Sequence, residues 1–333
     1  MSQLDLFGPP DTAPETGPAA TALAAAHDDA RALASALDPR VRFGTSSWSF
    51  PGWRGIVYSR ASSQRDLARD GLREYARHPL LRTVGIDRSY YAPIPDEDLT
   101  RYASQLPEGF LACAKAGASV TSTVRHGGRG EAPTANPTFL APEVLVEEML
   151  DPFRRHFHRF CGPILLEFPP LPRALSLAAS EFIEGLDRFL EHLPRDFHYA
   201  VELREASWLT PSYAATLKRH GASHVFNYWS AMPMPAEQAA VVAPEQQATT
   251  VIRLLLPPGA RYEQQREAFR PFDRLRAPDP VMREQVVALT RRSIAAGGNV
   301  FVLVNNKAEG SSPLTVTELA RLLTAHLHPR QPR

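Results

Sequence analysis

Eight short apolar segments, spaced along most of the chain, constrain the fold more than any other feature of this sequence. Several, such as FLACAKA and NVFVLVNN, are apolar almost throughout, which is typical of parallel strands covered on both faces. Segments with helical period lie between them, at 177–193, 212–221, 282–298 and 315–327. The predicted strands cover 41–47, 83–87, 110–116, 163–168, 199–204, 224–229, 250–256 and 299–306.

Eight strands alternating with helices predict an α/β fold, a (β/α)₈ TIM-like barrel, which we place over residues 39–330. The main alternative is a doubly wound open sheet. No G-x-G-x-x-G turn follows the first strand, and the sequence contains no Walker-type loop. The barrel is therefore favoured.

Residues 1–38 differ in composition from the rest of the chain. GPPDTAPETGP is typical of a disordered tail, and an Ala-rich helix is predicted from Ala20 to Asp38. No Lys or Arg precedes Arg31, which argues against a signal peptide, and no window is apolar enough to span a bilayer. We predict a cytoplasmic protein with no membrane partner, in which Cys113 and Cys161 are free core thiols.

Polar side chains stand where the predicted strands end, which is where TIM barrels place their chemistry. Charges inside apolar strands are costly unless they are paired, and Glu202 and Arg204 share one strand face. The catalytic candidates are Asp87, Lys115, Glu167, Glu202 and Arg204. The ligand-binding candidates are Trp48, Trp53, Tyr90, Tyr91, Asn227, Arg253 and Asn306.

Two interpretations of these residues stay open. They can form a pocket for a polar or anionic ligand, such as a sugar, a phosphate ester or a nucleotide. They can also form an ion-pair network that only closes the top of the barrel. Glu167 and Glu202 could act as an acid–base pair, whereas GTSSW does not match a nucleophile elbow.

The sequence predicts no histidine-based metal site, because no histidine follows a predicted strand. Asp87, Glu167 and Glu202 would suit a Mg²⁺-like ion if they converge. No cofactor is assigned.

Residues 261–276 combine arginines with aromatic side chains. Such a mixture suits contacts with phosphates and bases, although an amphipathic helix with a solvated basic face fits somewhat better. The net charge of +1 provides no overall attraction to DNA. The segment contains Arg261, Tyr262, Arg266, Phe269, Arg270, Phe272, Arg274 and Arg276.

Six motifs together resemble the YecE-like family, domain of unknown function 72. They are GTSSWSFPGWRG, TVGIDRSYYAPIP, FLACAKA, GPILLEFPPLP, YAVELREASW and VFVLVNNKAEG, in family order over about 41–325. The resemblance implies a TIM barrel but no established activity. The residues of this sequence that match the family's motifs by position are Trp48, Trp53, Tyr91, Lys115, Glu202, Arg204, Arg253 and Asn306.

The sequence departs from the family pattern at the second, fourth and seventh strands. Gly85 stands where the family usually has a glutamate, and Asp87 stands where it has an asparagine. Glu167 stands where glutamine is common in the family. RLLLPPG lacks the histidine of the family's R-x-H-G-like turn. These changes suggest a different ligand or a lost activity.

The first residues, MSQLDLFG, contain a pentapeptide that resembles the bacterial sliding-clamp-binding motif, Q-L-[S/D]-L-F. Leu6 and Phe7 could occupy an apolar groove while Gln3, next to Leu4, hydrogen-bonds at its entrance. The alternative is an incidental segment that packs on the barrel.

These features lead to three functional hypotheses. One is a DNA-associated enzyme, tethered to the clamp, that acts on phosphodiesters or nucleotides as a hydrolase or nuclease in DNA repair. Another is a small-molecule enzyme or binding protein for a sugar or phosphorylated metabolite. The third is a non-catalytic adaptor whose barrel mouth is a closed ion network.

Overall fold

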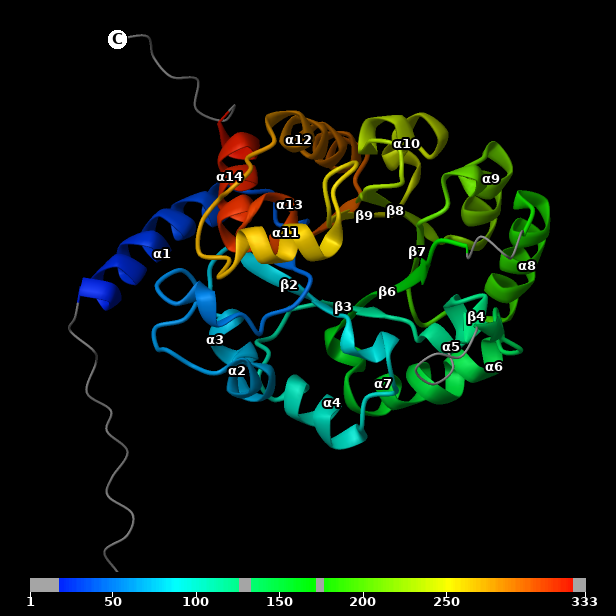
Figure 1. Ribbon diagram of the computed structural model, residues 1–333, viewed down its shortest axis with the longest axis horizontal. Helices are drawn as coiled ribbons and strands as arrows, with labels where there is room; N and C mark the ends of the chain where they lie inside the picture. The colour runs from blue at the N-terminus through cyan, green and yellow to red at the C-terminus, as the bar shows by residue number, and fades with distance from the viewer. Residues whose placement is uncertain (1–17, 126–132, 172–176, 326–333) are drawn as a thin grey trace, which may run out of the picture.

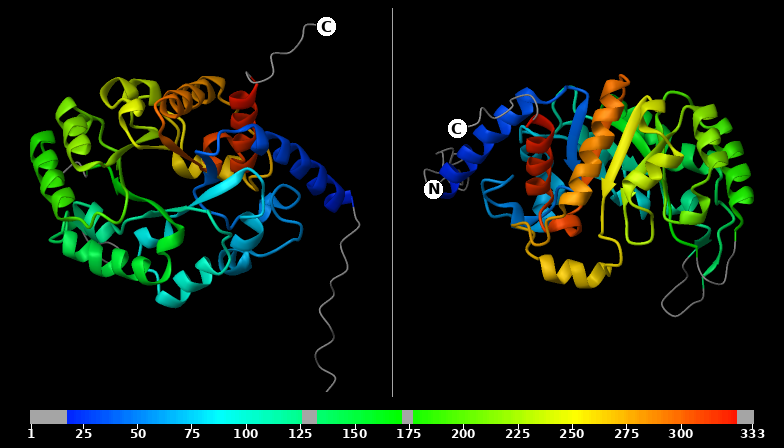
Figure 2. Two further views of the ribbon diagram at one scale, coloured as in Figure 1. Left: turned by 180° about the vertical axis from the view of Figure 1, so that it is seen from behind. Right: turned by 90° about the horizontal axis from the view of Figure 1, so that it is seen from above.

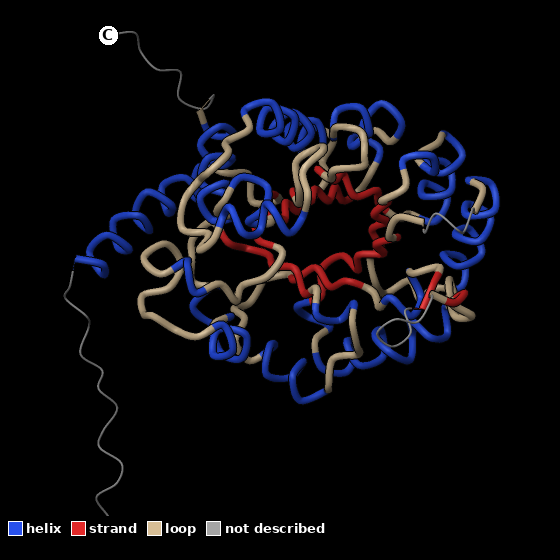
Figure 3. The backbone as a smooth tube through the Cα atoms, viewed as in Figure 1, coloured by secondary structure: helices blue, strands red, loops and turns tan. Residues whose placement is uncertain are grey.

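The computed structural model describes residues 18–125, 133–171 and 177–325, and its parallel strands close into a barrel inside a ring of helices (Figures 1 and 3). The barrel order is β1-β10-β9-β8-β7-β6-β3-β2, which confirms the TIM-like fold and excludes an open sheet. All eight predicted strands are present: β1 Val41–Thr45, β2 Leu81–Ile86, β3 Ala112–Lys115, β6 Cys161–Phe168, β7 Tyr199–Leu203, β8 Ser223–Tyr228, β9 Thr249–Leu254 and β10 Asn299–Val304.

Helices follow most strands and cover the outside of the barrel. The predicted helices at 177–193, 212–221, 282–298 and 315–327 are α8 Ala179–His192, α9 Pro211–His220, α12 Pro280–Ala295 and α14 Ser312–Thr324. The other helices are α2 Gln64–Asp70, α3 Leu72–Tyr75, α4 Asp96–Ala103, α5 Ala118–Thr121, α6 Pro142–Leu145, α7 Asp151–His156, α10 Pro235–Val241, α11 Tyr262–Phe269 and α13 Asn306–Glu309. A small ribbon, β4 Val124–Arg125 with β5 Thr134–Ala135, follows α5.

The predicted Ala-rich helix is α1, Pro18–Ala36, which packs beside α14 (Figure 1). The His27 ring lies 3.3 Å from the Ile56 carbonyl oxygen and helps to fix the helix to the barrel. Residues 1–17, including QLDLF, lie outside the described residues. In the described part of the chain, no helix is both long and apolar enough to cross a membrane.

Side chains inside the barrel form layers, because alternate residues of a strand point to the same face. The middle layer is apolar and buried: Cys113, Leu165, Ala200, Val225, Val251 and Phe301, with Leu303 packed on it one level higher, opposite Arg253. Two residues further along five of these strands come Lys115, Glu167, Glu202, Asn227 and Arg253. A polar layer therefore lies directly above the apolar one. Cys113 and Cys161 are both free thiols, as predicted.

A close approach between β1 and β2 shapes one side of the barrel. The register shifts between Phe43 and Gly44, and a Cβ atom on Gly44 would collide with the Thr83 carbonyl oxygen. Because this oxygen belongs to the backbone of the neighbouring strand, the clash cannot be relieved by a rotamer change.

We therefore expect Gly44→Ala to lower the free energy of unfolding by about 3 kcal/mol, as measured by urea denaturation. Gly109→Ala is the matched control, since open space surrounds a Cβ there and only its positive φ of 78° is strained. That control should cost roughly 1 kcal/mol. Equal losses in the two variants would contradict the close approach.

Candidate functional site

Six charged side chains form a continuous network at the carboxyl end of the barrel, and we call this network the ionic layer. Glu167 accepts from Lys115 Nζ at 2.9 Å, from Arg204 Nη2 at 2.9 Å and from Arg253 Nη1 at 2.8 Å. Glu202 pairs with Arg204 at 2.7 Å and also with Arg253. Arg253 Nη2 lies 3.3 Å from Asp87 Oδ1, which completes the layer.

The ionic layer is balanced in charge and is buried except at Asp87, whose side chain is partly exposed. It contains three cations and three carboxylates, and the side chains of Glu202 and Arg253 are 0% and 2% exposed. Burial alone would raise the pKa of Glu167, but the positive charges of Arg204, Lys115 and Arg253 overcome this and hold it well below its usual range. Its three cationic partners thus favour the ionised form of Glu167, which argues against a role for Glu167 as the general acid of the predicted acid–base pair.

Aromatic rings cover two of the cations in the layer. Lys115 Nζ lies 3.9 Å from the centre of the Tyr90 ring, and the Arg204 guanidinium lies 4.0 Å from the Trp229 ring. Both distances are favourable for cation–π contacts. Burial raises the pKa of Tyr90 to about 12, so its hydroxyl stays protonated. Tyr91 is 83% exposed and stands at the rim of the mouth.

Asn227 joins the network from β8. Its Nδ2 donates to the Leu203 carbonyl oxygen at 2.7 Å and lies 3.4 Å from Glu202 Oε1, while its Oδ1 accepts from Gln238. Gln238 in α10, which we did not single out from the sequence, holds the amide in place. Asn227 is therefore a buried support of Glu202.

The structure does not bring Trp48, Trp53 and Asn306 to the ionic layer. Trp48 Nε1 donates to the Leu67 carbonyl oxygen of α2 at 2.8 Å, so this ring packs under the outer helices. Trp53 is fully buried, and its Nε1 donates to Asn306 Oδ1 at 3.2 Å. Asn306 also accepts from the Ser312 amide at 2.8 Å. These three contacts fix the loops after β1 and β10, and all three side chains are buried there.

Lys307 is a candidate residue that the sequence analysis missed. It follows Asn306 at the start of α13, and its Nζ lies 4.3 Å from the Tyr262 ring of α11. It is 9% exposed and forms no ion pair with any carboxylate in the described residues. Burial lowers the pKa of Lys307 to about 8, which the negative charge of Asp87 partly opposes. Lys307 thus differs from Lys115, whose charge is fully paired.

The basic segment 261–276 lies at the same end of the barrel, where α11 stands beyond the strands (Figure 2). Its five arginines are exposed, but Phe269 and Phe272 are buried, at 7% and 9% exposed. Only Tyr262, at 47%, could stack on a ligand. The arginines are solvated, as in the alternative that we favoured, but α11 contains only Arg266, and the other four flank the helix or follow it in a loop.

The carboxylates of the mouth converge on arginines. Asp87, Glu167 and Glu202 surround the Arg253 guanidinium, which occupies the space that a Mg²⁺-like ion would need. Among the residues that the structure describes, no group of three His, Cys, Asp or Glu side chains could hold a metal ion.

A closed parallel barrel with a charged carboxyl end defines a TIM-barrel protein. Residues 42–333 match the sequence profile of the family described as "Protein of unknown function DUF72", and the chain belongs to that family. A DUF72 family protein from Thermotoga maritima has a similar structure, with a TM-score of 0.59 and 20% identity over 85% of this chain and 98% of that one. Another, from Enterococcus faecalis V583, has a TM-score of 0.56 and 16% identity, covering 88% and 100%. A search of curated proteins finds no match.

The ionic layer makes a direct prediction about stability. Arg253→Met removes the cation that contacts three carboxylates, and breaking a buried pair typically costs about 3–5 kcal/mol. We expect a loss of that size in the free energy of unfolding by urea denaturation. Arg292→Met, which breaks an exposed pair with Glu245, should cost about 1 kcal/mol or less. A loss in Arg253→Met no larger than this control would mean that the layer contributes little.

Proposed function

We propose that the barrel mouth binds a phosphorylated small molecule and that Lys307 contacts its phosphate. The observation that carries this proposal is the charge pattern of the mouth. The ionic layer is internally neutral, so its arginines have carboxylate partners already. Lys307 adds a positive charge that has no carboxylate partner in the described residues.

Burial is the largest influence on this amine and disfavours its ammonium form. The nearby charges are mixed, because Asp87 and Glu263 raise the pKa of Lys307 and Arg266 lowers it. An anion in direct contact with Lys307 would offset the cost of burial and stabilise the ammonium form. A phosphate group supplies up to two negative charges and several acceptor oxygens.

The remaining groups of the rim suit the rest of such a ligand. Tyr91 and Tyr262 are exposed aromatic rings, on which a sugar or a base can pack. The Asp87 side chain is 34% exposed, so its carboxylate can accept a hydrogen bond from a hydroxyl group of the ligand. Sugar phosphates and nucleotides combine these features, and both were among the classes predicted from the sequence.

We expect glycerol 3-phosphate, ribose 5-phosphate or AMP to bind in isothermal titration calorimetry, with at least tenfold weaker binding to Lys307→Met. Since binding uses the protonated amine, affinity should fall as pH rises through about 8, approaching tenfold per pH unit.

Lys218 provides the matched control, because it is exposed on α9. Lys218→Met should bind these ligands as the wild-type protein does. If no ligand in the panel binds, or if Lys307→Met binds equally well, the proposal is wrong, and the non-catalytic adaptor becomes the better hypothesis.

A second function is favoured by QLDLF and does not depend on the mouth. We propose that this pentapeptide docks on a bacterial sliding clamp, with Leu6 and Phe7 as apolar anchors and Gln3 as the polar contact. Docking would bring the barrel to DNA, where a nucleotide or a phosphodiester end would be the phosphorylated ligand. In this form the protein would be a DNA-associated enzyme.

We expect the full chain to bind a purified sliding clamp with micromolar affinity in calorimetry. The double variant Leu6→Ala/Phe7→Ala should lose this binding, because it removes both apolar anchors. Thr12→Ala/Thr16→Ala changes the same tail outside the motif and should bind normally. Equal binding by all three proteins would show that QLDLF does not dock.

A further inference from the structure

The amino end of the barrel carries a second polar layer, on the far side of the apolar middle layer. These residues lie two positions before residues of the middle layer, so the strand alternation points them to the same inner space. We call them the floor layer: His198, Ser223, Thr249 and Asn299, with Arg42 from β1. His198 Nε2 lies 2.9 Å from Ser223 Oγ, whose hydroxyl donates to the Thr249 carbonyl oxygen at 2.5 Å.

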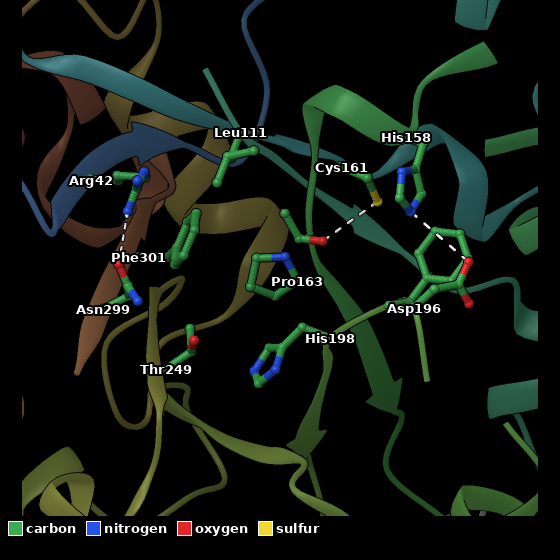
Figure 4. Close-up of a pocket in the computed structure, with 12 residues that line it drawn as sticks. Arg42, Leu111, His158, Cys161, Pro163, Asp196, His198, Thr249, Asn299 and Phe301 are labelled. Atoms are coloured by element: carbon green, nitrogen blue, oxygen red, sulfur yellow. Dashed lines mark hydrogen bonds and ion pairs between the residues drawn. The ribbon is translucent and has the colours of Figure 1, made fainter. Parts of the chain in front are cut away.

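The floor layer opens into a cavity of about 290 Å³ (Figure 4). This volume is close to the lower end for pockets that hold small organic ligands, about 300 Å³. Leu111, Pro163, Phe197 and Phe301 provide its apolar walls. His198, Thr249 and Asn299 place polar groups around the same space (Figure 4).

Arg42 is the cation of this cavity, and no carboxylate in the described residues pairs with it. Its Nη1 donates to Asn299 Oδ1 at 3.3 Å, and its Nε is buried with no hydrogen-bond partner. The guanidinium also lies 5.3 Å from the centre of the Phe301 ring. Such a group has unused hydrogen-bonding capacity, which is unusual for a partly buried arginine.

Other charges at the rim leave Arg42 unneutralised. Asp196 also lines the cavity, but its oxygens accept from Arg154 at 2.8 and 3.1 Å. His158 lies 3.9 Å from that same carboxylate. Arg82 adds a second positive charge, and burial together with this repulsion lowers the pKa of Arg42. An anion bound in the cavity would offset both the cost of burying the Arg42 charge and its repulsion from Arg82.

We propose that the cavity at the amino end of the barrel is a binding site for a small monocarboxylate with an apolar body, held by Arg42. A planar guanidinium matches a carboxylate through two parallel hydrogen bonds. Among the residues that line the cavity, Arg42 is the one arginine, which matches a single negative charge. The ring of Phe301 and the side chains of Leu111 and Pro163 would cover the apolar part of the ligand.

The site is separate from the barrel mouth. The middle layer lies between the floor layer and the ionic layer, and its side chains are at most 3% exposed. A ligand at the floor therefore cannot reach Lys307 through the barrel. The two sites can be tested independently on the same protein.

Sodium benzoate is the probe, and benzyl alcohol is its neutral match in shape. We expect calorimetry with the full chain to give a dissociation constant of about 1 mM or tighter for benzoate, and at least tenfold weaker binding for benzyl alcohol. Arg42→Met should bind benzoate at least tenfold more weakly. Lys307→Met, which changes the mouth alone, should bind benzoate unchanged.

Arg42→Met should also unfold at the same or a higher temperature without ligand, because it removes a desolvated charge and breaks no ion pair. Arg42→Lys keeps the charge but loses the planar guanidinium. Its affinity for benzoate should therefore lie between those of the wild-type protein and Arg42→Met. If benzoate fails to bind up to its solubility, or binds Arg42→Met as well as wild type, the proposal is overturned. Loss of benzoate binding in Lys307→Met would also overturn it, by placing the ligand at the mouth.

Discussion

The pairing of Glu167 and Glu202 with Arg204 and Arg253 is the interaction on which the upper half of the barrel depends. These four residues come from the carboxyl ends of β6, β7 and β9, so their ion pairs link strands that lie far apart in sequence. A buried charge without a partner costs several kcal/mol, so each member constrains the position of the others. Lys115 and Asp87 extend this constraint to the ends of β3 and β2.

The neutrality of the ionic layer determines which groups are left for ligands. Because its three cations and three carboxylates satisfy one another, the ionic layer behaves as a rigid polar base for the barrel mouth. Lys307 and Arg42 are cations that do not belong to the ionic layer. Lys307 lies above the layer, and Arg42 lies at the opposite end of the barrel. Each lies near aromatic side chains and lacks a carboxylate partner among the described residues. The apolar middle layer keeps these two charges apart.

Much of this arrangement could be predicted from the sequence, because it follows from strand periodicity. The apolar runs located every barrel strand, and the alternation within VELR correctly placed Glu202 and Arg204 on one face. The role of Trp53 could not be predicted, since the direction in which a loop turns depends on tertiary packing: this ring turns inward to Asn306. Lys307 and Arg42 were missed for a related reason. The absence of an ion-pair partner is a property of the folded structure, and no local pattern encodes it.

The protonation state of Lys307 tests the account most directly. The chain contains three lysines, Lys115, Lys218 and Lys307, so ¹³C-methylated lysine signals can be assigned with one Lys→Arg variant each. The signals are followed in an NMR titration from pH 6 to 11. We expect the Lys307 signal to titrate near pH 8, well below the usual lysine pKa of about 10.4. If the Lys307 signal titrates near that usual value instead, Lys307 is an ordinary paired or solvated lysine, and the mouth has no unpaired cation to offer a ligand.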